Sequence, residues 1–241
     1  MPDRSWRWAC VLPAAFICAP AQAEEPVTIG IEPYLWAPSI DGSVSLGPLV
    51  LPIDLKPVDL ASGLKMGAMG RVSLEKGPAF AAVEMIGVDF QRDAFAPTLG
   101  QDVAVRAVAA ELTGGYRFAV TPAVDLTPIA GFRYNYLKVR FGQAPAAIAV
   151  RGEWMEPAIG LQLAARPLRR VSVQGKVLAG RRSADRHSLD VRADVSYALR
   201  PWVRVFAGYR HMKQAFASPG PVPFAIDLGA DGPLVGVRAR F

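Results

Sequence analysis

Apolar and polar side chains alternate with a period of two along most of the chain after residue 24. The clearest example is 188–200, where Leu189 and Val191 share one face of a strand and Asp190 and Arg192 share the other. Successive side chains of a strand point to opposite sides of its sheet. The pattern therefore predicts strands that have one apolar face and one polar face.

Segments with many Gly and Pro residues divide the chain into ten stretches of this kind. The predicted strands are 27–46, 66–76, 79–91, 102–118, 122–141, 149–166, 170–182, 188–200, 202–216 and 225–241. An even number agrees with the single-chain barrels of bacterial outer membranes. Eight strands are the alternative, if the first two segments lie outside the membrane.

The connections between these segments alternate in length. Four are short, at 75–78, 118–122, 166–170 and 199–202, and five are longer, at 47–65, 91–101, 142–148, 183–187 and 217–224. Short periplasmic turns and longer outer loops are typical of outer-membrane barrels. We therefore expect an all-β fold, a closed antiparallel up-and-down transmembrane barrel with the short turns in the periplasm.

The longest connection, 47–65, is unusually apolar for a loop. We expect it either to fold into the mouth of the barrel as a lid or to extend the first hairpin outside the membrane. Residues 57–62 begin with Pro, which is favoured in the first turn of a helix, and they predict one helical turn.

Composition limits how the chain can cross a membrane. Hydrophobic residues make up 51% of the chain, yet no stretch after residue 23 reaches the roughly 20 apolar residues of a spanning helix. Every backbone donor and acceptor within lipid needs a partner, so strands can span a bilayer only as a closed barrel. If the protein spans a bilayer, it does so with strands.

Residues 1–23 predict a secretory signal peptide. Arg4 and Arg7 precede an apolar stretch that ends in the small-x-small sequence of residues 21–23, which is the pattern of a cleavage site. We expect cleavage before Glu24, which leaves one outer-membrane barrel domain over 24–241. A membrane helix is the alternative, but the apolar run is short and contains two prolines.

Processing removes both cysteines, Cys10 and Cys18. A mature chain without cysteine has no disulfides, thiol catalysis or cysteine-ligated metal. Removal of two Arg and one Asp takes the 27 basic and 21 acidic residues to 25 and 20, a net charge of +5. These basic residues are dispersed singly, so no nucleic-acid partner is expected.

Two segments resemble those of known outer-membrane proteins. The last predicted strand alternates apolar residues with Arg238 and Arg240 and stops on Phe241, similar to the terminal strand that the barrel-assembly machinery reads. Residues 33–42, Pro-Tyr-Leu-Trp-Ala-Pro-Ser-Ile-Asp-Gly, resemble an aromatic segment of a family of uncharacterised bacterial outer-membrane β-barrels. The resemblance implies the bacterial cell outer membrane, with its lipid and lipopolysaccharide as surroundings, and no catalytic residues.

The polar faces of the strands predict a network of charges in the lumen. Its predicted members are Glu32, Arg71, Glu84, Glu111, Arg117, Arg133, Asp190, Arg192, Asp194, Arg204, Arg210, Arg238 and Arg240, and the same faces carry Glu75, Gln162, Gln174 and Lys176. A barrel of eight to ten strands has room only for side chains or one small ligand. Two interpretations stay open: a plug of paired charges, or a narrow pore whose surplus arginines favour small polar or anionic solutes.

Aromatic residues cluster near the predicted ends of strands. They are Tyr116, Phe118, Tyr134, Tyr136, Tyr197, Trp202 and Phe241. We interpret them as girdles at the two membrane interfaces. The alternative is the general enrichment of aromatic residues in sheets.

Basic residues also gather around one predicted outer loop, at Arg181, Arg182 and Arg186. Arg binds phosphate in a bidentate manner, so these residues are candidates for contact with lipopolysaccharide, although a solvated rim would have the same composition.

Catalysis has little support in the sequence. The two histidines, His187 and His211, lie near predicted outer ends of strands, and Asp185 and Ser188 flank the first. Adjacent residues of a strand point apart, whereas a hydrolytic triad requires convergent geometry. A lipid-modifying enzyme is therefore a minor alternative, and no metal site or cofactor is expected.

Overall fold

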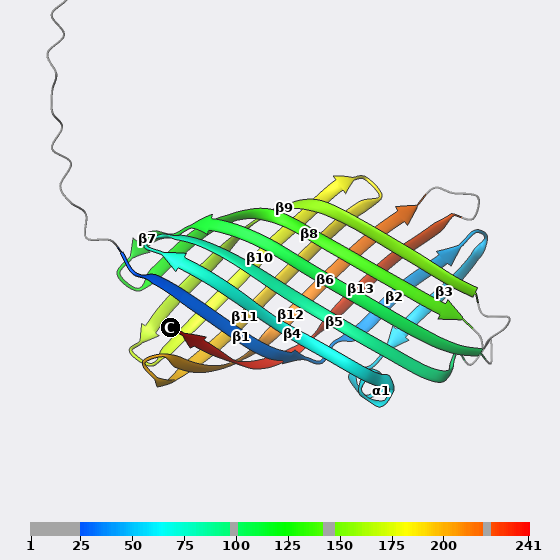
Figure 1. Ribbon diagram of the computed structural model, residues 1–241, viewed down its shortest axis with the longest axis horizontal. Coiled ribbons are helices and arrows are strands. Elements are labelled where there is room, and N and C mark those ends of the chain that lie inside the picture. Colours follow the sequence, from blue (N-terminus) through cyan, green and yellow to red (C-terminus); the bar gives the residue numbers. More distant parts are fainter. Residues whose placement is uncertain (1–24, 97–100, 142–147, 219–222) are drawn as a thin grey trace, which may run out of the picture.

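The fold is a closed antiparallel barrel with a wall of ten strands (Figure 1). The computed structural model describes residues 25–96, 101–141, 148–218 and 223–241. In order around the wall, the strands are β1 (Val27–Trp36), β4 (Leu64–Lys76), β5 (Ala79–Ala96), β6 (Gln101–Tyr116), β8 (Val124–Phe141), β9 (Ile148–Leu168), β10 (Val171–Ser183), β11 (Arg186–Arg200), β12 (Val203–Ser218) and β13 (Phe224–Arg240). Pairing of β13 with β1 closes the ring.

This topology confirms the predicted ten-stranded barrel, and the eight-strand alternative is wrong. Both β1 and β4 belong to the wall, since they pair with each other and with its other strands. The predicted signal peptide, 1–23, lies outside the described residues and stays a prediction.

The first predicted strand, 27–46, divides into two strands. β1 ends at Trp36, and β2 (Ser39–Leu46) begins after a break at Ala37 and Pro38. Both strands pair with β13: β1 pairs with the C-terminal half of β13, and β2 pairs with the N-terminal half of β13. Pro38 has no N–H to give to a ladder, and the Ala37 N–H donates to the Pro233 carbonyl at 3.0 Å.

The long apolar connection after β2 forms a hairpin and a short helix. β2 turns at Gly47, whose φ of 57° is easily adopted by glycine, into β3 (Leu49–Leu55). α1 (Pro57–Gly63) follows and leads into β4. Of the two arrangements expected for this connection, the structure has the extended hairpin, and the helix begins at the predicted proline.

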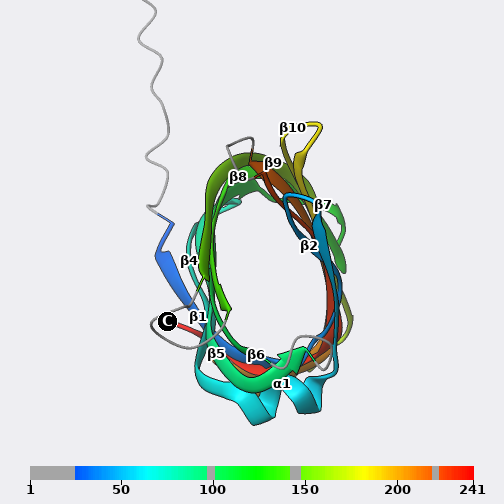
Figure 2. The ribbon, with the colours of Figure 1, turned by 90° about the vertical axis from the view of Figure 1, so that its right-hand side faces the viewer.

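A seam in the hydrogen-bonded wall separates β3 from the outer part of β4. β1 pairs with β4 only as far as Pro33 and Gly70. Beyond that point Leu64–Met69 pair with β5 alone, and β3 pairs with β2 alone. In the described ranges, no backbone ladder joins these two edges, and α1 lies at the rim beside them (Figure 2).

One predicted turn is itself a strand. Residues 118–122 were expected to form a short periplasmic turn, but β7 (Phe118–Thr121) pairs with the start of β8. The turn proper is therefore the two residues Pro122 and Ala123, which makes this connection a tight hairpin.

The outer surface of the wall is apolar over most of its height. Met85, Ile159, Val195 and Val237 are among the large side chains exposed on it, while their neighbours along each strand point inward and are buried or half-buried. An outward apolar band is the surface that lipid requires of a barrel. No helix in the described part of the chain is long and apolar enough to cross a bilayer.

Glycine allows close approach of strands at inward positions of the wall. A Cβ built on Gly131 of β8 would lie 1.9 Å from the Leu112 carbonyl oxygen of β6. At outward Gly175 of β10, the nearest atom to such a Cβ is 4.0 Å away.

We expect Gly131→Ala to lower the free energy of unfolding by about 1–3 kcal/mol, because the added methyl must displace backbone. Gly175→Ala is the matched control and should change the stability much less. Guanidinium unfolding from lipid vesicles measures both variants, and equal stabilities would contradict the close approach.

Candidate functional site

A layer of buried charged side chains crosses the middle of the lumen. Its members, which we call the charge layer, are Glu32, Glu84, Glu111, Arg133, Glu156, Lys176, Asp190, Arg192, Asp194, Arg210 and Arg238. They project from the inward positions of nine wall strands. The period-two pattern supplies three of them from β11 and one from each of the other eight strands.

Lys176 lies at the centre of this layer. Its Nζ is 3.1 Å from Glu84 Oε2, from Glu111 Oε1 and from Asp190 Oδ2. The lysine comes from β10 and the three carboxylates from β5, β6 and β11. β10 and β5 are separated by at least three other strands around the wall in either direction, so the contact with Glu84 crosses the lumen, whereas Asp190 is on the neighbouring strand β11.

Arg210 of β12 makes a second set of contacts. Its Nε and Nη2 donate to the two oxygens of Asp190 at 2.9 and 2.8 Å. Its Nη1 donates to Glu84 Oε1 at 2.6 Å and to the Tyr34 hydroxyl at 2.8 Å. Tyr34 in turn donates to Glu84 Oε1 at 2.6 Å. A bidentate arginine held on both sides in this way has a fixed geometry.

Arg133 of β8 completes the outer part of the layer. It donates to Glu111 at 3.0 Å and to Asp190 at 3.4 Å. It also donates to the Ser188 hydroxyl at 2.6 Å, and Ser188 donates to Glu156 of β9. A neutral hydroxyl therefore links the arginine to a buried carboxylate that has no direct ion pair with it.

Glu32 of β1 anchors the part of the layer nearer the short turns, at the end of the barrel that the sequence predicts to be periplasmic and that we call the periplasmic end. It accepts hydrogen bonds from Arg192 Nη2 and Arg238 Nε, both at 2.5 Å. Asp194 lies 3.2 Å from Arg192 Nε and 3.5 Å from Arg238 Nη2. Both guanidiniums also lie over the Phe206 ring, at 5.1 and 4.9 Å from its centroid.

Below the charge layer, a polar cavity of about 150 Å³ opens toward the periplasmic end. The predicted lumen residues outside the layer line this cavity. Arg117 pairs with Glu75 at 2.7 Å, Arg240 lies 3.4 Å from Glu75, Arg204 donates to Ser172 at 3.2 Å, and Arg71 lies over the Phe80 ring. Asp125 and Arg166 form a further pair at this end.

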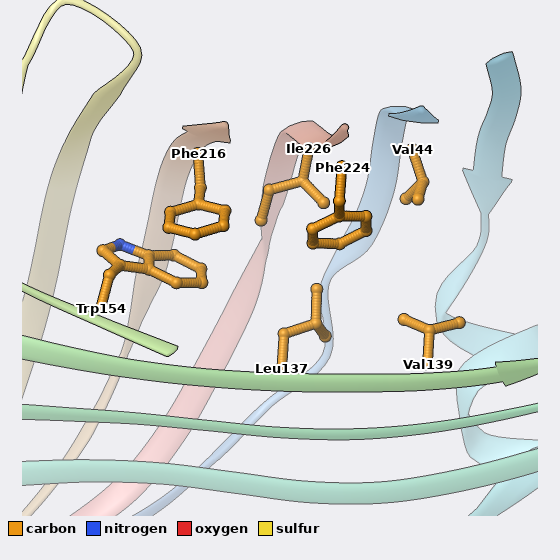
Figure 3. Close-up of a cluster of buried hydrophobic side chains, with 7 residues drawn as sticks. All are labelled: Val44, Leu137, Val139, Trp154, Phe216, Phe224 and Ile226. Atoms are coloured by element: carbon orange, nitrogen blue, oxygen red, sulfur yellow. The ribbon is translucent and has the colours of Figure 1, made fainter. Parts of the chain in front are cut away.

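The outer half of the lumen is apolar, which was not predicted. A cavity of about 300 Å³, which we call the apolar chamber, lies here. Buried side chains from opposite walls meet beside it (Figure 3). They are Val44, Leu137, Val139, Trp154, Phe216, Phe224 and Ile226. Trp154 stacks on Phe216 with ring centroids 4.3 Å apart.

The structure places the predicted interface aromatics on the outer surface. The ring centroids of Tyr116 and Phe118 are 5.1 Å apart at the periplasmic end, and those of Trp202 and Phe241 are 6.0 Å apart at the same end. Tyr197 is exposed at the same end.

Two more of these aromatics mark the other side of the apolar band. Tyr134 donates to Glu153 at 3.1 Å, and Arg151 lies over the Tyr136 ring at 5.2 Å. The outer surface thus carries charged side chains at the height of Tyr134 and Tyr136 along the barrel axis.

The arginines proposed to contact lipopolysaccharide lie at the outer turn between β10 and β11. Arg181 and Arg182 are exposed, and Arg182 donates to the Met155 carbonyl at 3.2 Å. Arg186 lies over the Phe216 ring at 5.1 Å and donates to the Ala217 carbonyl at 3.3 Å. The first two thus have more freedom to reach an outside ligand.

The residues weighed for catalysis do not converge. His187 is exposed and its Nδ1 lies 3.0 Å from the Ala184 carbonyl, whereas Ser188 is buried in the lumen. His211 is on the outer surface. Within the described ranges, no group of three or more His, Cys, Asp or Glu could hold a metal ion.

We expect Asp190→Asn to destabilise the barrel by about 3 kcal/mol, because Lys176, Arg133 and Arg210 would lose a shared counter-charge in a buried site. The matched control is Asp89→Asn, which breaks the pair with Arg106 on the outer surface. It should leave the free energy of unfolding nearly unchanged, since solvent screens that pair. Similar losses in both variants would contradict the importance of the layer.

By sequence, the chain matches no family model and no curated protein. Its structure is similar to that of the outer membrane protease OmpT from Escherichia coli, with a TM-score of 0.57 and 9% identity over 89% of this chain and 97% of that one. The translocator domain of the autotransporter NalP from Neisseria meningitidis is less similar, with a TM-score of 0.41 and 14% identity over 92% of this chain and 90% of that one. Ail from Yersinia pestis has a TM-score of 0.40 and 11% identity over 90% of this chain and 99% of that one. The similarity to OmpT establishes the fold, which is that of an outer-membrane β-barrel.

Proposed function

We propose that the protein is an integral barrel of the bacterial outer membrane whose lumen is closed by the charge layer. In this account it is a scaffold, neither a passive pore nor an enzyme. The apolar outer surface, the girdle aromatics and the barrel fold support the location. The family suggested by residues 33–42 stays a prediction, as do contacts with the barrel-assembly machinery.

The main observation in favour of a closed lumen is that charged side chains from opposite walls are buried. Arg133 is 1% exposed, Arg210 2% and Asp190 0%. Water-filled pores leave such groups hydrated, whereas buried charges are tolerated only when they are paired and hydrogen-bonded. The layer also contains both signs, so it lacks the ring of a single charge that favours one type of ion.

We predict that the refolded protein forms no stable open channel in planar lipid bilayers. The double variant Arg210→Ala, Asp190→Ala removes one cation and one anion together, which keeps the charge balanced and leaves a gap. We expect this variant to show single-channel conductance.

The control is Arg106→Ala, Asp89→Ala, which deletes an ion pair from the outer surface and should stay closed. Stable conductance of the unmodified protein at low voltage would refute the closed lumen.

We also propose that Arg181 and Arg182 contact lipopolysaccharide phosphates. Their exposure at the outer end of β10 favours this role, because lipopolysaccharide presents its phosphates at the outer interface. We expect Arg181→Ala, Arg182→Ala to reduce retention of lipopolysaccharide on the purified barrel. The control is Arg169→Ala, Arg170→Ala at the periplasmic turn, and an equal effect of both pairs would refute the contact.

A further inference from the structure

We infer that the apolar chamber is a binding site for a small molecule that carries an alkyl chain and an oxygen acceptor. The inference requires the barrel to reside in a membrane, but it does not require the lumen to be closed to ions. The chamber is separate from the charge layer, and its occupancy can be measured independently of conductance.

The walls of the chamber are almost wholly apolar. Its lining includes Ile86, Ala109, Leu137, Met212 and Leu228 from five different strands. At about 300 Å³ the cavity is comparable with the smaller ligand sites of proteins, which start at roughly 300 Å³ and are lined mainly by apolar side chains. An alkyl chain suits such walls, because its transfer from water is favourable.

Two buried donors in the chamber have no partner among the described residues. They are Asn135 Nδ2 and Trp36 Nε1, and both residues line the cavity. Asn135 is 2% exposed, and its Oδ1 already accepts from Gln214 Nε2 at 2.9 Å, which fixes the amide so that Nδ2 remains free. Because an unpaired buried N–H is costly, these donors call for an oxygen acceptor in a ligand.

The two donors lie at the floor of the chamber. Asn135 is two positions along β8 from Arg133, and the Arg210 guanidinium lies 5.5 Å from the centroid of the Trp36 ring. The acceptor of a ligand would therefore lie next to the charge layer, and its alkyl chain would extend outward past Leu137 and Ile226. A carboxylate, hydroxyl or carbonyl oxygen can accept a hydrogen bond from either donor.

The seam described above lies beside the chamber. Trp36, Pro38 and Ile40 line the chamber on one side of the seam, and Met69 of β4 lines it on the other. Leu60 of α1 is also part of the lining. Among the described residues no backbone ladder holds these edges together, so the wall lacks hydrogen bonds between strands at a place where apolar lining residues lie on both sides.

The seam begins within the height of the membrane. Met69 is seven residues from Lys76 at the periplasmic turn, which places it roughly 16 Å above that turn at about 3.3 Å per residue and a 45° tilt. The apolar band of such barrels is about 25 Å tall. Two sources then fit the chemistry: a free amphiphile such as a fatty acid, or the acyl chain of a membrane lipid.

Tryptophan quenching by bromine tests the site. The Trp202→Phe variant keeps Trp36 and Trp154, both of which line the chamber, as the tryptophans of the mature chain. Refolded in vesicles of unbrominated phosphatidylcholine, it is titrated with 11-bromoundecanoic acid. We expect saturable quenching.

A matched pair of substitutions separates binding from partition into lipid. Ala109→Phe fills the chamber, whereas Ala110→Phe adds the same ring to the lipid-facing side of β6. We expect the first to abolish saturable quenching and the second to retain it. If Ala109→Phe does not fold, as judged by its heat-modifiable mobility on gels, Ala107→Phe replaces it at another lining position.

The acceptor is tested with Asn135→Leu. We expect about three- to tenfold weaker binding of the acid, the usual value of one hydrogen bond, and unchanged binding of 1-bromoundecane. Equal effects on both probes would overturn the role of the donors. Equal, unsaturable quenching in the Ala109→Phe and Ala110→Phe variants would overturn the site itself.

A last arm distinguishes the two sources. Vesicles made of acyl-chain-brominated phosphatidylcholine, without added acid, replace the titration. Quenching that Ala109→Phe removes and Ala110→Phe retains identifies a lipid acyl chain as the occupant. Quenching that is the same in both variants, together with saturable binding of the acid, identifies a free amphiphile.

Discussion

The structure depends on the need to pair charges that are buried inside a narrow barrel. Lys176, Arg133 and Arg210 all contact Asp190, and each also contacts a glutamate of β5 or β6. Removing any one of these charged side chains leaves its partners as unpaired charges in a buried site, which lowers the stability of the barrel. Because Lys176 and Arg210 reach Glu84 on a strand far away in the sequence, these contacts fix the relative positions of the walls and close the lumen.

The charge layer also divides the lumen into two chemically different halves. Toward the periplasm, ion pairs such as Arg117 with Glu75 line a small polar cavity. Toward the outside, apolar side chains surround a larger cavity into which two unpaired donors project. The charge layer thus forms the floor of the apolar chamber. The break between β1 and β2 at Pro38 places the seam beside this chamber.

The period-two pattern predicted the fold and the side of the wall on which each residue lies. It could not predict the height of those residues along the barrel axis, which depends on the stagger between strands. Lys176 and Glu84 are 92 positions apart in the chain, and only the assembled registers bring them together. Trp154 and Glu156 have the same parity on β9, yet one lines the apolar chamber and the other joins the charge layer.

The most direct test of the central claim is a double-mutant cycle across the lumen, with Lys176→Met and Glu84→Gln. The free energy of unfolding from vesicles is measured for both single variants and for the double variant. Direct contact across the lumen predicts a coupling energy of at least about 1 kcal/mol, with the double variant less damaged than the sum of the two. Additivity within about 0.5 kcal/mol would contradict the charge layer as the interaction that holds the walls together.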